Sequence, residues 1–168
     1  MEHVAVKILN RHRLMAISTV RPDGWPQTTM VGYVNRGFDI FFLIFRSGQK
    51  FANILHDDRV SIAVCAEASE LNDLKAVYAG GHAVEISDQD ERDEIWRRFM
   101  ERSSNLAGFQ MPDAKQAVFM KLRCKYVSVL DFSQGVGHRE QVTLDDQGQP
   151  IDVQVGTDEW VEGGVTGQ

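Results

Sequence analysis

The sequence predicts a mainly β protein, an antiparallel barrel or sandwich decorated with a few short helices. About six segments rich in aromatic and β-branched residues are typical of strands, and short turns connect most of them. Helical patterns do not alternate regularly with these strands, which argues against a doubly wound sheet and so against the commonest dinucleotide scaffold. A chain of 168 residues, of which 43% are hydrophobic and 25% charged, is sufficient for one such domain.

The charge balance excludes two classes of partner. The chain carries 18 Lys and Arg residues against 24 Asp and Glu, a net charge of −6. No basic stripe is present to neutralise phosphates, so we expect no nucleic acid and no membrane surface among the partners. Cys65 and Cys124 form neither a disulfide framework nor a Cys-x-x-Cys pair, and no metal site is expected. Because the start lacks a signal-peptide profile and no apolar run has bilayer length, the expected location is cytoplasmic.

The segment up to Phe45 predicts a helix followed by three strands. Apolar residues recur at helical spacing over 4–12, and basic residues lie toward the end of that segment, where they favour a helix C-terminus. Turns are predicted at Pro22-Asp23-Gly24 and Asn35-Arg36-Gly37, since proline presets φ and glycine accepts a positive φ. The three strands are expected at 15–20, 27–34 and 38–45.

The middle of the chain predicts a helix over 48–56, a buried strand over 60–65 and a strand over 76–86. Gly80 and Gly81 interrupt the last of these strands, and we expect a bulge or a close approach of another backbone there. Ser87 or Asp88 can cap a charged helix that runs to about residue 102, because Asp90 and Glu91 follow at capping-box distance.

Two more strands are predicted near the end, over 117–123 and 126–132. Beyond Gly137 the chain is acidic and rich in glycine, and residues 163–168 are expected to fray. We therefore expect a domain at 1–137 and a C-terminal tail at 138–168. Trp160 is an isolated aromatic residue in this polar tail, a pattern typical of an anchor, for instance to a partner subunit.

The most informative segment is the junction between the third strand and the helix that follows. Lys50 stands in the first helical turn, where the macrodipole and free N–H groups favour anions rather than cations. A phosphate held by Ser47, the amides near Gly48 and the side chains of Arg46 and Lys50 would account for this arrangement. The alternative is that Ser47 only caps the helix while Arg46 and Lys50 are solvated, and strand–serine–helix junctions of that kind are common.

The order of these elements resembles the pyridoxamine 5'-phosphate oxidase-like family of FMN-binding split-barrel proteins. The resemblance covers about residues 4–134. It rests on the first helix, on the hairpin over 14–45 with Gly24-Trp25-Pro26 at the entry to its second strand, and on the helix start Ser47-x-x-Lys50. It continues through the segment 53–60, the motif Gly80-Gly81-His82-Ala83 and the late segment 127–133. It implies a six-stranded antiparallel split barrel, and a homodimer that binds two FMN molecules at the subunit interface.

The resemblance also implies where FMN would lie. The second strand would line the isoalloxazine ring through backbone groups, and the strand-to-helix junction would hold the ribityl chain and the phosphate. The implied cofactor-binding residues are Thr28, Thr29, Met30, Val31, Phe45, Arg46, Ser47, Gln49 and Lys50. Only one of the two adjacent threonine hydroxyls can face a ligand, because neighbouring strand residues point to opposite faces.

The function class stays open at this stage. One hypothesis is an FMN-dependent oxidoreductase, oxidase or reductase, that exchanges a hydride with a small-molecule substrate, its catalytic residues unknown. The others are a non-catalytic carrier or sensor of FMN, a relative that holds deazaflavin or haem, and a dimeric module with an empty cleft. The acidic segment 158–164 differs from the Arg-rich end with which the oxidase itself binds its substrate phosphate, which argues against that substrate here.

Overall fold

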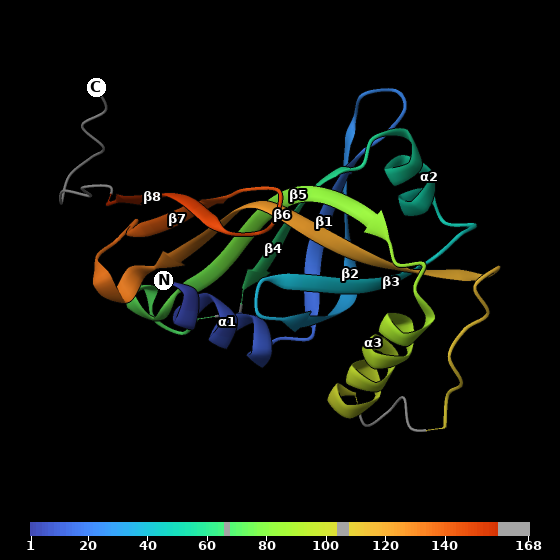
Figure 1. The fold of residues 1–168 in the computed structure, drawn as a ribbon. Helices are drawn as coiled ribbons and strands as arrows, with labels where there is room; N and C mark the ends of the chain where they lie inside the picture. Colours follow the sequence, from blue (N-terminus) through green and yellow to red (C-terminus); the bar gives the residue numbers. More distant parts are fainter. Residues whose placement is uncertain (66–67, 104–107, 158–168) are drawn as a thin grey trace.

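The computed structural model describes residues 1–65, 68–103 and 108–157. Figure 1 shows a strongly bent antiparallel sheet with the helices arranged around it. The helices are α1 Glu2–Arg11, α2 Gln49–His56 and α3 Gln89–Arg102, with short 3-10 turns η1 Leu71–Asp73 and η3 Phe132–Gln134. The strands are β1 Leu14–Val20, β2 Pro26–Arg36, β3 Asp39–Phe45, β4 Arg59–Cys65, β5 Lys75–Glu85, β6 Ala117–Asp131, β7 Arg139–Leu144 and β8 Pro150–Gly156.

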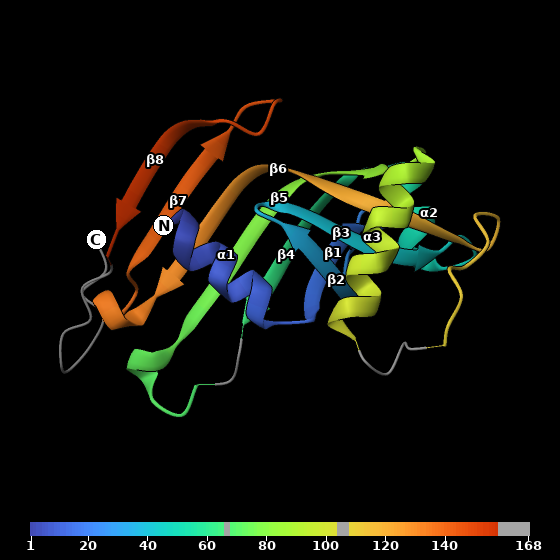
Figure 2. The same cartoon turned by 60° about the horizontal axis from the view of Figure 1, so that its bottom comes forward.

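The first six strands form a closed barrel. The sheet has the order β3-β2-β1-β4-β5-β6-β7-β8, and β3 pairs in addition with β6, from Ile40 opposite Leu122 to Phe45 opposite Ala117. This second pairing closes the barrel and confirms the expected mainly β, six-stranded antiparallel fold. β7 and β8 continue the sheet past the barrel as a hairpin, with β8 at the outer edge (Figure 2).

The two predicted turns and the predicted cap of the charged helix are present in the structure. Gly24 and Gly37 have φ values of 86° and 58°, so both predicted turns use a glycine in the left-handed region. Asp88, rather than Ser87, caps α3, and its carboxylate accepts a hydrogen bond of 2.8 Å from the amide of Glu91.

The two strands predicted over 117–123 and 126–132 are a single strand, β6. A bulge in its pairing with β5 sets Gly80 opposite Tyr126 and Gly81 opposite Cys124, which leaves Lys125 as the extra residue. The bulge bends the strand without ending it, so its first part pairs with β3 and its last part with β7. The sequence signal read as a break was this bend, and the predicted bulge at the two glycines is confirmed.

The region after Gly137 contains two strands that the sequence pattern did not predict. Its acidic residues make a turn between them. The carboxylate of Asp145 accepts hydrogen bonds from the amides of Gln147 and Gln149, at 2.9 and 2.8 Å, and Gly148 has a φ of 78°. Trp160 and the segments 158–164 and 163–168 lie outside the described residues.

Two apolar clusters position the helices. Inside the barrel, Ala5, Ile8 and Leu9 of α1 pack with the inward side chains of the strands. Outside it, Ile95 and Phe99 of α3 form a second cluster around Phe119, Phe41 and Val34. Helix α2 buries Phe51 and Ile54 against the barrel, beside β1 and β3. The junction that precedes α2 is thereby held at one end of the barrel (Figure 1).

We predict that Gly81→Ala destabilises the protein by about 1–3 kcal/mol or more, through overpacking. A Cβ on Gly81 would lie 2.0 Å from the carbonyl oxygen of Arg123, a backbone atom that cannot rotate away. Urea unfolding measures the change. Gly32→Ala is the control, since its Cβ would meet only the oxygen of Arg13 at 3.9 Å. Equal stabilities of the two variants would contradict the prediction.

Candidate functional site

The barrel is open along half of β2. β1 pairs with β2 from Pro26 to Gly32, whereas β3 pairs with it only from Tyr33 to Arg36. On the side away from β1, the backbone groups of residues 27–31 therefore have no strand partner in the described part of the chain. Buried backbone groups must be satisfied, so a free edge of this kind needs water or a ligand. Four of the predicted cofactor residues, 28–31, lie on it.

The side chains of this edge alternate between two faces. Thr28 and Met30 are exposed on the outside of the barrel, and Thr29 and Val31 are half-buried on the inside. The hydroxyl of Thr28 is 2.7 Å from that of Ser18, the residue directly opposite it on β1. The hydroxyl of Thr28 therefore faces outward, and that of Thr29 does not.

The start of α2 combines unsatisfied amides with an unpaired cation. The helix is capped by Gly48, with no side-chain hydrogen bond, so Ser47 is not its cap. The amides of Ser47, Gln49 and Lys50 have no acceptor among the described residues. In the same part of the structure no carboxylate lies within 4.0 Å of the Lys50 ammonium, and partial burial lowers the pKa of that group. An anion bound here would offset the cost of burying the charge.

A buried asparagine ties this helix start to the open edge of β2. Asn53 is 0% exposed. Its amide nitrogen donates to Thr19 Oγ1 and to Gln27 Oε1, both at 2.9 Å, and its oxygen accepts from Gln49 Nε2 at 2.8 Å. The predicted phosphate-binding turn and the predicted ring-binding strand are therefore linked by hydrogen bonds through Asn53.

Arg46 and Phe45 complete the junction in different ways. The guanidinium of Arg46 forms an ion pair with Glu85, donates to the carbonyl of Ala114 at 2.6 Å and lies over the ring of Phe51. Its charge is already compensated within the chain. Phe45 is largely exposed at the end of β3. The predicted contacts of both residues with a ribityl phosphate stay predictions.

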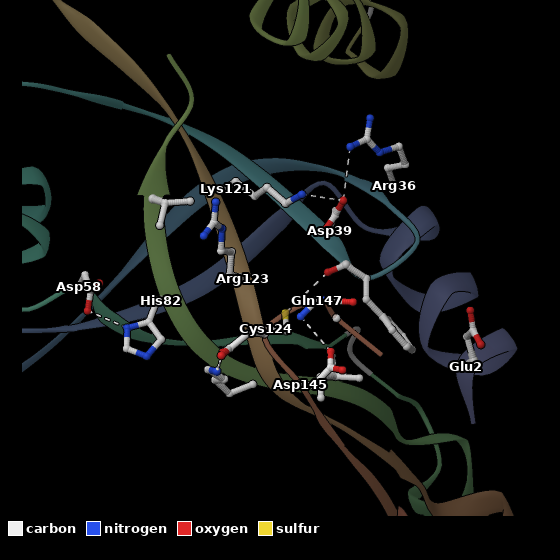
Figure 3. A pocket seen from close by; sticks show the side chains of 16 residues that line it. Glu2, Arg36, Asp39, Asp58, His82, Lys121, Arg123, Cys124, Asp145 and Gln147 are labelled. Carbon is white, nitrogen blue, oxygen red and sulfur yellow. Dashed lines mark hydrogen bonds and ion pairs between the residues drawn. The ribbon is translucent and has the colours of Figure 1, made fainter. Parts of the chain in front are cut away.

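A cavity of about 740 Å³ lies elsewhere, on the outer side of β6 and under the β7–β8 turn (Figure 3). Most of its charged side chains pair within the chain, as Lys121 with Asp39 and Lys125 with Asp146, and His82 Nδ1 lies 2.8 Å from Asp58 Oδ1. Burial raises the pKa of the Cys124 thiol to about 12, so this thiol is not a ready nucleophile. None of the predicted cofactor residues lines this cavity.

A second hollow of about 500 Å³ lies on the outer faces of β1, β4 and β5. Its floor consists of small residues that lie opposite one another in the sheet, Ser18, Ser61 and Gly80, with Tyr126 at one side. Because Thr28 lies opposite Ser18, this flat floor continues directly into the outer face of the β2 edge. The candidate site is therefore an open face of the sheet with the Lys50 ammonium near one end, and it is not an enclosed pocket.

Comparison with known protein families assigns the fold. Residues 1–131 match the family model described as pyridoxamine 5'-phosphate oxidase. The chain belongs to this family. No curated protein matches the chain.

Solved structures with the same fold include three that differ in what their names say they bind or do. A heme-binding protein from Mycobacterium smegmatis has a TM-score of 0.68 and 19% identity over 83% of this chain and 57% of its own. A provisionally assigned pyridoxamine 5'-phosphate oxidase from Listeria innocua has a TM-score of 0.65 and 16% identity, covering 77% of this chain and 97% of its own. An FAD-binding protein from Mesorhizobium loti has a TM-score of 0.59 and 20% identity, and the match covers 74% of this chain and 90% of its own. At these identities the likeness concerns the fold alone.

Two negative findings apply to this member of the family. No helix in residues 1–65, 68–103 and 108–157 is long and apolar enough to cross a membrane. Within the same ranges, no group of three or more His, Cys, Asp or Glu side chains is arranged to hold a metal ion.

Asn53, Thr19 and Gln27 are the site residues that the sequence analysis missed. A signal for one of them was present, because Asn53 lies on the apolar face of its helix between Phe51 and Ile54. A polar residue at such a core position needs partners. Which strands supply them is a matter of tertiary structure, so Thr19 and Gln27 carried no signal of their own.

We predict that Asn53→Ala destabilises the protein by about 1–3 kcal/mol, because the buried hydroxyl oxygen of Thr19 and the partly buried side-chain oxygen of Gln27 lose their hydrogen-bond donor. Chemical denaturation gives the free energy. Leu55→Ala, on the exposed side of the same helix, serves as the control and should stay within about 0.5 kcal/mol of wild type. Similar losses in both variants would mean that the hydrogen bonds are not the cause.

Proposed function

We propose that this protein binds FMN and is an oxidoreductase that acts on a small molecule. The observation that carries the proposal is the unpaired, partly buried Lys50 among free amides, in contact through Asn53 with the unpaired edge of β2. A charged corner and a free strand edge side by side match the two ends of a flavin mononucleotide, a phosphate and a planar ring with polar edges.

The phosphate end is supported by electrostatics. An FMN phosphate carries about two negative charges, and on a chain of net charge −6 it needs a local cation and fixed donors. The Lys50 ammonium, the three free amides and the exposed hydroxyl of Ser47 supply both. We place Gln49 beside them as a side-chain donor. Arg46, already bound to Glu85, would act mainly by holding the turn against the barrel.

The ring end is supported by the geometry of β2. The unpaired N–H and C=O groups of residues 27–31 can pair with the polar edge of a ring, as they would with another strand. Thr28 and Met30 would then flank the ring on the outside, and the small residues of the neighbouring floor would allow it to lie close to the sheet. The residues present therefore fit the cofactor.

The cofactor would supply the hydride chemistry, and the chain would bind it, orient it and control access to it. The site is open on its outer side, and Trp25, Met30 and Leu14 expose apolar surface around it. A second copy of the chain seated on this face would exclude water from the ring. We therefore propose a homodimer with the cofactor at its interface and a small-molecule substrate entering beside it.

The absorption spectrum of the purified protein tests the proposal. We expect the two visible bands of a flavin, and release on denaturation of a compound that co-chromatographs with FMN rather than FAD. A Soret band would instead assign the protein to the haem-binding members of this fold, a possibility raised by the M. smegmatis relative. Bleaching of the holoprotein by a reduced nicotinamide dinucleotide under anaerobic conditions, with hydride transfer to the flavin and formation of the oxidised nicotinamide, would identify an electron donor and separate an enzyme from a carrier. A colourless protein that does not bind added FMN would refute the proposal.

We predict that Lys50→Ala weakens FMN binding by about 1.5–3 kcal/mol, through loss of a charge-assisted bond to the phosphate. Quenching of flavin fluorescence on titration with the apoprotein measures the affinity. Riboflavin, which lacks the phosphate, should bind the variant and the wild type equally. Lys7→Ala, on the exposed side of α1, is the matched control. Unchanged FMN affinity in Lys50→Ala would remove this residue from the site.

A further inference from the structure

The last strand presents a second free edge with a different character. β8 pairs with β7 along one side, and its other side has no partner in the described part of the chain (Figure 2). Ile151, Val153 and Val155 alternate along it and are 64%, 58% and 65% exposed. A regular, apolar, unpaired edge strand is a template for pairing with another strand.

This apolar row continues the core of the protein. Val153 lies directly opposite Val142 of β7, so both side chains are on the same face of the sheet. Val142 is 1% exposed and belongs to the barrel cluster, whereas Val153 beside it is open. The terminal amine of Met1, just before α1, pairs with Glu140 of β7, whereas the side chains of β8 from Pro150 to Val155 are exposed. The apolar core therefore ends at β8, whose apolar side chains are exposed to solvent.

The usual protections of an edge strand are weak here. β8 contains no lysine or arginine, one carboxylate at Asp152, and a proline only at its first position. By contrast, β3 at the other end of the strand order is covered by β6. Among the described strands, β8 is the one exposed along its full length on one side.

We propose that β8 pairs antiparallel with β8 of a second copy of this chain, about a two-fold axis at Val153. The sequence of the strand is complementary to itself in this register. Val153 meets Val153, Ile151 meets Val155, and Asp152 meets Gln154, so no two like charges are opposed. The six apolar side chains lie on one face, continuous with Val142 of each copy.

Neighbouring registers are less favourable. A two-fold axis at Asp152 would place two carboxylates opposite each other. A shift by one residue would put apolar and polar side chains on the same face, because the side-chain period of a strand is two. Pairing about Val153 buries the most apolar surface without opposing charges, and it leaves the flavin face of the barrel free.

Cysteine substitution tests the register. In a Cys65→Ser background the remaining native thiol, Cys124, is buried. We expect Val153→Cys to form a disulfide-linked dimer under mild oxidation, since two residues facing each other on the axis have Cα atoms about 4.5–5.5 Å apart. Gln154→Cys is the control and should stay monomeric on non-reducing gels, because its diagonal self-distance of about 7–8 Å exceeds disulfide reach. Equal cross-linking of the two, or none, would overturn the proposal.

A pair of lysine substitutions tests the assembly without cross-linking. Val153→Lys opposes two ammonium groups on the axis and should halve the molar mass measured by light scattering. Gln154→Lys, one residue away, faces Asp152 of the other copy and should keep the mass of wild type. If residues 158–168 or a different protein cover the edge instead, neither substitution changes the mass, and the proposal fails.

The outcome is independent of the flavin proposal. The substituted positions lie on β8, and the cofactor residues lie on β2 and the β3–α2 junction. If the protein shows no flavin bands but Val153→Cys still cross-links, the cofactor proposal is refuted and the β8 interface is supported. If the protein carries flavin but Val153→Cys does not cross-link, the β8 interface is refuted and the cofactor proposal is supported.

Discussion

The close contact between the backbones of β5 and β6 determines most of this architecture. Gly81 has no room for a side chain against the carbonyl of Arg123, and the bulge beside it gives β6 one extra residue. The resulting bend lets one strand pair with β3 at its start and with β7 at its end. Because β3 leaves β2 to pair along β6, the first half of β2 loses its partner. The open edge of the barrel is therefore a consequence of how the barrel closes.

The electrostatics of the chain set the junction apart from the rest of the surface. Arg46, Lys121, Lys125 and His82 each have an acidic partner within the chain. Such exposed pairs contribute little to stability, but each places an acidic side chain next to the basic one. Among the residues that the structure describes, Lys50 has no such partner, and it loses hydration on burial, an arrangement that lowers stability unless an anion is bound. Groups perturbed in this way are concentrated at functional sites.

The two free edges differ in what they can bind. The edge of β2 lies beside a cation and free amides, and its outer neighbours are small or polar. The edge of β8 is regular, nearly uncharged and apolar on the face that continues the core. A polar ring with an anionic group would match the first edge. Another extended strand would match the second, since its backbone groups and its alternating apolar side chains would both find partners.

Much of the fold could be predicted from sequence because its signals are local. Alternating apolar residues, the glycine turns and the Asp88 cap determine strands, turns and helix ends within a few residues of themselves. The ordered motifs were also sufficient to indicate the family that residues 1–131 match. The sequence likewise located the unusual lysine at the start of α2, since a cation at that end of a helix is recognisable without knowing its neighbours.

Contacts between distant segments were decided by the tertiary structure alone. Two predicted strands became the bent β6, because whether a strand ends or bulges depends on the partner across from it. The residues of 139–156 pair as β7 and β8 only because the end of β6 offers them an edge. Asn53 meets Gln27, and Arg46 meets Glu85, across separations that no local pattern encodes. Sequence by itself determined which residue types carry charge and which segments are extended, whereas three-dimensional packing decided which charges are compensated and which edges stay free.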